Sequence, residues 1–293
     1  MFDAEHPEVR NAIKRALAED IGTGDVTSEL TVPEDIQARG TFIANQRFVL
    51  AGIELLPLIY DQRAGAHVEI LARSGSSVSM GDVLGTAIAS ARTLLECERV
   101  CLNFLQRLSG VATLARKHVD AVAGTNVRVL DTRKTTPGLR QLEKMAAAAG
   151  GVINHRRGLF DQVLIKNNHI AAAEGVRAAL DKVRCFAGPV EIEVRTRAEL
   201  DEALSAGANR LLLDNLSPPE AAEWIRYIAG RATVELSGGI NLENIRAYAE
   251  AGPNFISCGA ITHSAPAVDI SFRLELIENV DLPTARSAAD RKA

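Results

Sequence analysis

The segment DTRKTTPGLR, residues 131–140, places Arg133, Lys134 and Arg140 beside two adjacent threonines, directly after an apolar run. The whole chain has 33 Lys and Arg residues against 37 Asp and Glu, so this concentration of cations is local. Arg offers a planar fork for carboxylates or phosphates, and Lys offers a mobile point charge. The segment predicts a site for a small anion, and the acidic balance argues against nonspecific nucleic-acid binding.

Five further short apolar runs, at 161–166, 190–194, 210–215, 233–239 and 255–260, also end in or are followed by polar residues or glycine. Because carboxyl ends of parallel strands meet at one rim, these residues are expected to line a common charged cavity. The rim residues are Thr132, Arg133, Lys134, Thr135, Lys166, Asn168, His169, Glu193, Arg195, Asp214, Asn215, Ser237, Gly238, Gly239, Gly259 and Ala260. His155 and Arg156, from the segment NHRRG, and Arg99 add positive charge, which indicates a ligand with more than one negative group.

Two carboxylates, Glu193 and Asp214, interrupt this cationic set. They predict Mg²⁺, ligand hydroxyls or a positive charge that develops during reaction. An ion pair from Glu193 to Arg195 or Lys166 is the simpler interpretation. The segment SGG at 237–239 has the small residues that let backbone N–H groups approach a phosphate. Together these features favour a phosphorylated sugar as one ligand.

The elements that must position these residues alternate between strand and helix from residue 126 onward. Six or more such units favour a closed or nearly closed parallel α/β barrel over an open doubly wound sheet, and no GxGxxG follows the first strand. Upstream, residues 7–19 predict a helix that runs into a loop at 22–35, and 38–90 is rich in strand patterns. Residues 92–124 have helical spacing, with a break expected at Ser109-Gly110.

The four cysteines, Cys97, Cys101, Cys185 and Cys258, form no CxxC pair, which is typical of thiols in a reducing compartment. The first twenty residues carry acids and lack an apolar core, so no signal peptide is expected. No stretch approaches the roughly 20 apolar residues of a membrane span. These observations predict a cytoplasmic protein.

The order of several long motifs identifies a resemblance that covers nearly the whole chain. They run from ALAEDIGTGDVTSELT (16–31) and ERVCLNFLQRLSGVAT (98–113) through DTRKTTPGLR and GGVINHRRGLFDQVLIKNNHI (150–170) to EIEV, LLLDN, ELSGGI and ISCGAITHSAPAVDISF (256–272). In this order they resemble the quinolinate phosphoribosyltransferases, also called nicotinate-nucleotide pyrophosphorylases (carboxylating).

The resemblance implies an α/β fold: an N-terminal α/β sandwich domain plus an incomplete parallel, TIM-like α/β barrel. We expect the first domain at 1–110, with the C-terminal tail 270–293 packing on it, and the barrel at 111–269. The family forms dimers, or larger assemblies of dimers such as hexamers, in which one subunit covers the barrel mouth of the other. Arg99 matches the family arginine that reaches into the partner's site.

The implied reaction joins quinolinate to 5-phosphoribosyl-1-pyrophosphate with Mg²⁺, giving nicotinate mononucleotide, pyrophosphate and CO₂ in NAD biosynthesis. The implied catalytic residues are Lys134, Lys166, Glu193 and Asp214, of which Glu193 and Asp214 hold Mg²⁺, directly or indirectly. The implied substrate-binding residues are Arg99, Thr132, Arg133, His155, Arg156, Lys166, Ser237, Gly238, Gly239 and Gly259. The pair Arg156-Arg157 leaves open which arginine faces the ligand, although the family NHR pattern favours Arg156. Arg195 stands where many relatives have an acidic or neutral residue.

Three alternatives stay open at this point. A paralogous group associated with molybdenum transport shares much of the pattern and takes a different acceptor. A Schiff-base barrel aldolase would use Lys166, which ends the run VLIK. A non-catalytic binding scaffold would tolerate substitutions along the rim.

Overall fold

The computed structural model describes residues 3–277, whose first part is built on an antiparallel sheet. Its strands lie in the order β12-β1-β5-β3, with β1 at Gln37–Ala44, β3 at His67–Ile70, β5 at Val83–Ser90 and β12 at Ile270–Leu276. A small pair, β2 (Phe48–Val49) and β4 (Ser77–Val78), adds a second sheet. Helices α1 (Pro7–Ile21), α2 (Val26–Thr31) and α3 (Leu55–Asp61) complete this α/β unit.

Strand β12 returns from the far end of the chain to this first sheet. It pairs antiparallel with β1, from Ala38 opposite Leu276 to Ala44 opposite Ile270. Phe42 and Phe272 are opposite each other, with ring centroids 4.9 Å apart. The start of the expected C-terminal tail therefore lies on the N-terminal sheet, and residues 278–293 lie outside the described part of the chain.

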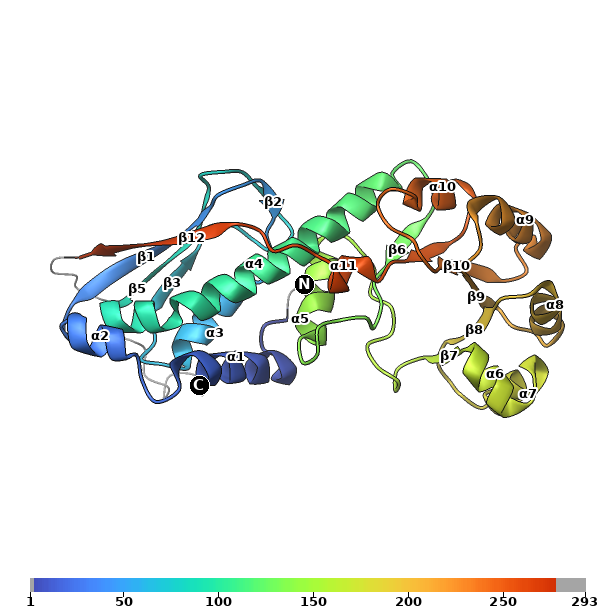
Figure 1. Ribbon diagram of the computed structural model, residues 1–293, viewed down its shortest axis with the longest axis horizontal. Helices are drawn as coiled ribbons and strands as arrows, with labels where there is room; N and C mark the ends of the chain where they lie inside the picture. The colour runs from blue at the N-terminus through green and yellow to red at the C-terminus, as the bar shows by residue number, and fades with distance from the viewer. Residues whose placement is uncertain (1–2, 278–293) are drawn as a thin grey trace, which may run out of the picture.

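Helix α4 (Ala91–Ala121) links the two halves of the molecule without a break (Figure 1). The expected break at Ser109-Gly110 is wrong, because both residues serve close packing inside a continuous helix. A Cβ on Gly110 would lie 2.0 Å from the carbonyl oxygen of Pro266, and the buried Ser109 hydroxyl accepts the Ala51 N–H at 3.0 Å. Small residues here mark a tight crossing of segments distant in sequence.

The loop expected at 22–35 is partly wrong as well, because it contains the short helix α2. Asp25 caps this helix by accepting the N–H groups of Thr27 and Ser28, both at 3.1 Å. Its three threonine and serine positions hid the helix in the sequence, since these residues favour turns as readily as helix starts.

The second half is a parallel sheet of six strands with helices between them, as the strand and helix alternation predicted. The sheet order is β6-β11-β10-β9-β8-β7. Its strands are β6 (Arg128–Leu130), β7 (Val163–Ile165), β8 (Val190–Val194), β9 (Arg210–Asp214), β10 (Thr233–Ser237) and β11 (Phe255–Ser257). Its helices are α5 (Arg140–Ala149), α6 (Asn167–Ala173), α7 (Val176–Lys182), α8 (Arg197–Ser205), α9 (Pro218–Ile228), α10 (Ile245–Glu250) and α11 (Ala260–His263).

The barrel is incomplete, as expected, because the edge strands β6 and β7 form no ladder with each other within residues 3–277. Beside β6 the chain adds one isolated parallel bridge, Leu130 with Ile153. The segment that follows this bridge carries His155 and Arg156 back to the carboxyl end of the strands. The opening therefore brings an extra loop to the rim.

Successive side chains of each strand point to opposite faces, so some face the hydrophobic core and their neighbours face away from it. Val194, Leu213 and Leu236 are buried and belong to the hydrophobic core. Their neighbours Glu193 and Asp214 line a cavity at the carboxyl end of the sheet. No helix among residues 3–277 is both long enough and apolar enough to cross a membrane.

Candidate active site

A cavity of about 670 Å³ opens at the carboxyl end of the parallel strands. Three of the rim residues expected from the sequence, Thr135, Asn168 and His169, do not line it. Every catalytic or substrate-binding residue that the resemblance implied, except Arg99, does line it. These residues are Thr132, Arg133, Lys134, His155, Arg156, Lys166, Glu193, Asp214, Ser237, Gly238, Gly239 and Gly259. The six strand ends, and the loop that follows Ile153, therefore converge as the polar rim predicted.

Two arginines that the sequence singled out lie elsewhere. Arg99 is exposed on α4 and is not among the residues that line this cavity. Arg157 is also absent from the lining; its side chain is 56% exposed and lies 3.9 Å from Asp161. Arg156 is buried and lines the cavity, so the structure turns Arg156 rather than Arg157 toward the site.

Arg133 and Arg156 form the cationic side of the cavity. The Nε of Arg133 is shielded from solvent and has no hydrogen-bond acceptor within the described chain. Burial, and then the neighbouring charge of Arg133, lower the pKa of Arg156. A buried donor without an acceptor, beside a second guanidinium, is the arrangement that an anionic ligand stabilises.

The loop that carries His155 is held by a buried ion pair. Lys144 Nζ lies 2.5 Å from Asp131 Oδ1 and donates to the carbonyl oxygen of His155 at 3.0 Å. The same Asp131 oxygen accepts the His155 N–H at 2.8 Å, and Asn154 donates to the other Asp131 oxygen at 2.6 Å. Asp131 follows β6 and Lys144 lies on α5, so the sheet and its covering helix fix this backbone together.

A second buried carboxylate holds the TTPG part of the first loop. Glu143 on α5 accepts the Thr136 N–H at 3.0 Å and the Thr136 hydroxyl at 2.7 Å. Arg107 on α4 pairs with Glu143 at 2.7 Å and donates to the carbonyl oxygens of Thr262 and Ala265. The long helix therefore helps to shape the site loop, although it contributes no residue to the cavity lining.

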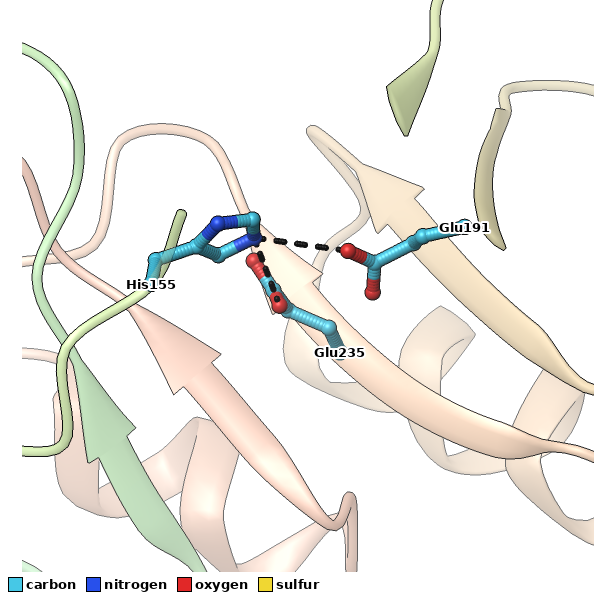
Figure 2. Close-up of side chains that lie close together, drawn as sticks. All are labelled: His155, Glu191 and Glu235. Atoms are coloured by element: carbon cyan, nitrogen blue, oxygen red, sulfur yellow. Dashed lines mark ion pairs between the residues drawn. The ribbon is translucent and has the colours of Figure 1, made fainter. Parts of the chain in front are cut away.

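The side chains of His155, Glu191 and Glu235 meet (Figure 2), and of these His155 and Glu235 line the cavity. The Nε2 of His155 lies 3.3 Å from Glu191 Oε2 and 3.4 Å from Glu235 Oε2, and both glutamates are about 1% exposed. Nδ1 of the same ring accepts the Arg156 N–H at 2.7 Å. Both ring nitrogens thus face protein groups, so His155 presents its ring and charge to the cavity.

The two glutamates decide the charge of this ring. Burial lowers the pKa of His155, but the hydrogen bonds and charges of Glu191 and Glu235 outweigh it and raise that pKa to about 9. The Arg156 N–H at Nδ1 opposes a second ring proton, because a doubly protonated ring has no lone pair there to accept it. Burial, and secondarily the charge of Glu191, raise the pKa of Glu235. The two glutamates therefore favour the protonated ring, whereas the Arg156 N–H favours the neutral ring.

The same contacts argue against a metal ion at this cluster, although its atoms lie within 4.8 Å of one another. A ring whose Nδ1 accepts the Arg156 N–H carries its proton on Nε2 in the neutral form. Nε2 then points an N–H, not a lone pair, at the two carboxylates. The cluster is an ion network that includes a histidine.

Glu193 and Asp214 form the acidic side of the cavity and share one arginine. Arg195 Nη2 lies 2.9 Å from Glu193 Oε1 and 3.1 Å from Asp214 Oδ2. Lys166 Nζ is 3.9 Å from the other Glu193 oxygen. The ion pair that the sequence offered as the simpler interpretation of Glu193 is therefore present, and it extends to Asp214.

The turn after β9 and the turn after β10 pack closely against each other at a glycine. Gly238 has φ 98°, and a Cβ there would lie 2.2 Å from Asn215 Oδ1. Asn215 itself has φ 59°; its N–H donates to the Ser237 carbonyl at 2.9 Å and its side chain donates to Asp214 at 2.7 Å. Gly238 thus allows the SGG turn to pass against the Asp214-Asn215 turn.

The side chain of Lys134 packs closely against a second glycine, Gly259. A Cβ on Gly259 would lie 2.8 Å from Lys134 Cδ and 3.2 Å from the ring of His263. The Lys134 carbonyl accepts the Thr262 hydroxyl at 2.9 Å, and its N–H donates to Thr132 Oγ1 at 3.0 Å. Gly259 therefore leaves room for the lysine to lie across the turn after β11.

Two models of one family match consecutive parts of this chain. The quinolinate phosphoribosyl transferase N-terminal domain matches residues 25–109, and the C-terminal domain of the same enzyme matches residues 111–273. The chain belongs to the quinolinate phosphoribosyltransferase family.

Relatives agree over nearly the full length. A nicotinate-nucleotide pyrophosphorylase [carboxylating] from Mycobacterium leprae is 40% identical, covering 94% of this chain and 100% of that protein. A probable enzyme of the same name from Bacillus subtilis is 37% identical, covering 92% and 95%. Among solved structures, the nicotinate-nucleotide pyrophosphorylase from Francisella tularensis is 36% identical with a TM-score of 0.88, covering 92% of this chain and 96% of that one.

The sequence did not lead us to several residues that line the cavity of this quinolinate phosphoribosyltransferase. Glu235, Ser257, Asn241 and His263 line it, and none was among the predicted site residues. Glu235 had a detectable signal, because it precedes Ser237 by two positions on one strand and so faces the same side. Asn241 and His263 had none, since each lies beyond the end of its strand.

Proposed function

We propose that the cationic side of this cavity binds one substrate and the acidic side binds the other. The chain is a decarboxylating quinolinate phosphoribosyltransferase: it transfers phosphoribosyl from 5-phosphoribosyl-1-pyrophosphate to quinolinate and yields nicotinate mononucleotide, pyrophosphate and CO₂ for NAD biosynthesis. The observation that carries the division is the unsatisfied, buried Nε of Arg133 on one side of a cavity whose other side holds Glu193 and Asp214.

Quinolinate fits the cationic side. Its two carboxylates match Arg133, Arg156 and Lys166, and His155 lines the cavity with them. Guanidinium groups pair with carboxylates through two parallel hydrogen bonds, which fixes the plane of the pyridine ring. Such fixing directs the ring nitrogen at the electrophile, and orientation of this kind contributes several kcal/mol to the rate.

The phosphoribosyl group fits the remaining rim. Ser237, Gly238 and Gly239 form the turn for the 5′-phosphate together with Gly259, and Thr132 and Lys134 lie toward the pyrophosphate. Glu193 and Asp214 take the ribose hydroxyls. When pyrophosphate leaves C1′ with the electron pair of the C–O bond, positive charge develops on the ribose, and these carboxylates stabilise it.

Decarboxylation follows from the new N–C1′ bond. Once the ring nitrogen is quaternary, the C2 carboxylate leaves as CO₂ and its bonding pair stays on C2, stabilised by the pyridinium; a proton from the medium then completes nicotinate mononucleotide. Arg133 and Lys166 hold that carboxylate in place beforehand. The protein's part is therefore positioning and electrostatics rather than covalent catalysis, and the aldolase alternative for Lys166 has no support from the comparisons.

The acidic side also fits a magnesium ion. Glu193 and Asp214 come from adjacent parallel strands, are 5% and 14% exposed, and offer the carboxylate oxygens that Mg²⁺ prefers. Mg²⁺ bound there would neutralise the charge of the leaving pyrophosphate. Both acids also contact Arg195.

A second copy of the chain completes the site in this proposal. Arg99 is exposed on α4, outside the cavity of its own subunit. In a homodimer with shared sites it would reach the partner's cavity and add a further cation for quinolinate. A hexamer built from such dimers would have the same sites. The four cysteines are free, three of them buried, which supports the cytoplasm as the compartment.

The test is an assay of purified protein with quinolinate, phosphoribosyl pyrophosphate and Mg²⁺, in which nicotinate mononucleotide and CO₂ are measured together. Equal amounts of both products from quinolinate, and none from nicotinate offered in parallel, are the expected result. Failure of a folded protein to use quinolinate would move the acceptor to that of a paralogous phosphoribosyltransferase. Sedimentation of the same sample reports the oligomeric state.

A further inference from the structure

Arg195 occupies the space between the two acids of the cavity. Its Nη2 lies 2.9 Å from Glu193 Oε1 and 3.1 Å from Asp214 Oδ2, so one nitrogen bridges carboxylates from neighbouring strands. A cation shared by both carboxylates would have to lie in this same space. Asp214 accepts a hydrogen bond from this nitrogen, whereas Glu193 Oε1 forms an ion pair with it but accepts no hydrogen bond within the described chain.

The backbone of Arg195 is anchored while its side chain is free to leave. Its N–H donates to Glu199 Oε2 at 2.7 Å, as part of the capping contacts that start α8 with Thr196. The side chain is 45% exposed, whereas Glu193 is 5% exposed. Displacing the guanidinium costs the ion pairs with Glu193 and Asp214 but leaves the loop unchanged.

The other charges near Glu193 and Asp214 are few or distant, so Arg195 dominates the positive charge at these acids. Lys166 is 3.9 Å from Glu193, and its side chain is 49% exposed. Without Arg195, Asp214 would keep only the amide of Asn215 as a donor within the described chain, and Glu193 only that distant lysine. A divalent cation would then meet two carboxylates with little competing positive charge.

We propose that Arg195 is an internal counter-cation that competes with Mg²⁺ for Glu193 and Asp214, so that the metal enters together with the pyrophosphorylated substrate rather than alone. This proposal rests on the function given above, because it takes that acid pair as the metal site. Phosphate oxygens supply the further ligands that let Mg²⁺ displace the guanidinium. Arg195 thereby acts as a positioning residue for the order of binding.

The experiment measures Mn²⁺ binding to substrate-free protein by water proton relaxation. Arg195→Gln removes the competing charge. Arg197→Gln is the matched control, because Arg197 lies two positions further on, outside the cavity, where its guanidinium is 3.9 Å from Glu223 and lies over the ring of Tyr227. We expect Arg195→Gln to bind Mn²⁺ about tenfold more tightly than the wild type, the factor that two half-exposed ion pairs support. Arg197→Gln should match the wild type.

Adding Asp214→Asn to Arg195→Gln should abolish the gain, which would locate the metal at this acid pair. Equal Mn²⁺ affinity of Arg195→Gln and wild type would overturn the proposal. If Arg195→Gln does not fold, the wild type still gives a decision: inorganic pyrophosphate should tighten its Mn²⁺ binding beyond the affinity of pyrophosphate alone for the ion, and absence of this synergy contradicts the proposal. None of these readouts needs turnover, so a wrong acceptor and a wrong role for Arg195 give different results.

Discussion

The ammonium of Lys144 and the carboxylate of Asp131 lie 2.5 Å apart, and both side chains are at most 2% exposed. Burial raises the pKa of Asp131 and lowers that of Lys144, although each charge opposes the shift of the other. Burying this ion pair is therefore unfavourable by itself. Its two members bond the carbonyl oxygen and the N–H of His155, and so hold the backbone of the site loop. It fixes the loop from which Arg156 reaches the cavity.

Lys144→Met is expected to destabilise the protein by about 3–5 kcal/mol, because it leaves Asp131 as an uncompensated buried charge. Urea unfolding followed by circular dichroism measures this change. Lys117→Met on the exposed face of α4 is the control for loss of a lysine charge and should stay within about 0.5 kcal/mol of wild type. A small effect of Lys144→Met would show that the pair does not hold the loop.

Lys166→Ala is expected to lower turnover severely, by about 100-fold or more, without unfolding the protein. Its side chain is 49% exposed, so its loss leaves no buried cavity, but it removes a cation from the carboxylate that departs as CO₂. Steady-state rates with quinolinate and the melting temperature should be measured on the same sample. Lys182→Ala on α7 controls for the lost charge, and near-normal turnover of Lys166→Ala would refute the role.

Arg156 shows how far sequence reasoning reaches in this protein. The NHRRG motif offered two adjacent arginines, and the family pattern favoured the first, which the structure turns into the cavity. The strand ends were predictable because polar residues interrupted apolar runs at regular intervals, and all six strands lie where those runs predicted. The pattern of apolar and polar residues along the chain was therefore enough to predict this part of the site.

Contacts between distant segments could not be predicted in the same way. Ser109-Gly110 resembled a helix end in the sequence. The true reason for the glycine was hidden, because the carbonyl of Pro266 that requires it lies more than 150 positions away. The partners of His155 were hidden for the same reason, since Glu191 and Glu235 come from β8 and β10 and looked like ordinary strand residues. Period and composition identify faces of elements, but they do not identify which faces meet.

Glu235→Gln is expected to change how stability depends on pH. The folded-state pKa of His155, about 9, lies above its ordinary value of 6.5, so this group stabilises the protein fully below pH 6.5. That contribution is lost as the pH rises through 9. The raised pKa of Glu235 acts in the same direction, because ionising a buried carboxyl destabilises the folded state as the pH rises.

Melting temperatures between pH 6 and 10 test this expectation. The wild type should lose stability across the interval, and Glu235→Gln should lose less of it above pH 7, because the pKa of His155 falls toward its ordinary value. Glu243→Gln, an exposed position outside the cavity, should follow the wild-type curve. Identical curves for all three proteins would mean that Glu235 does not set the charge of His155.

Gly238→Ala is expected to weaken binding of phosphoribosyl pyrophosphate about tenfold through displacement of the SGG turn. The new Cβ would lie 2.2 Å from Asn215 Oδ1, so either the turn or Asn215, which also donates to Asp214, must move. Gly252→Ala is a matched control, because Gly252 has φ 84° but no atom within 4 Å of the added Cβ. Both variants bear the strain of a positive φ, about 1–3 kcal/mol. Only the first changes the cavity, so equal KM values for phosphoribosyl pyrophosphate in the two variants would contradict the placement of the phosphate at this turn.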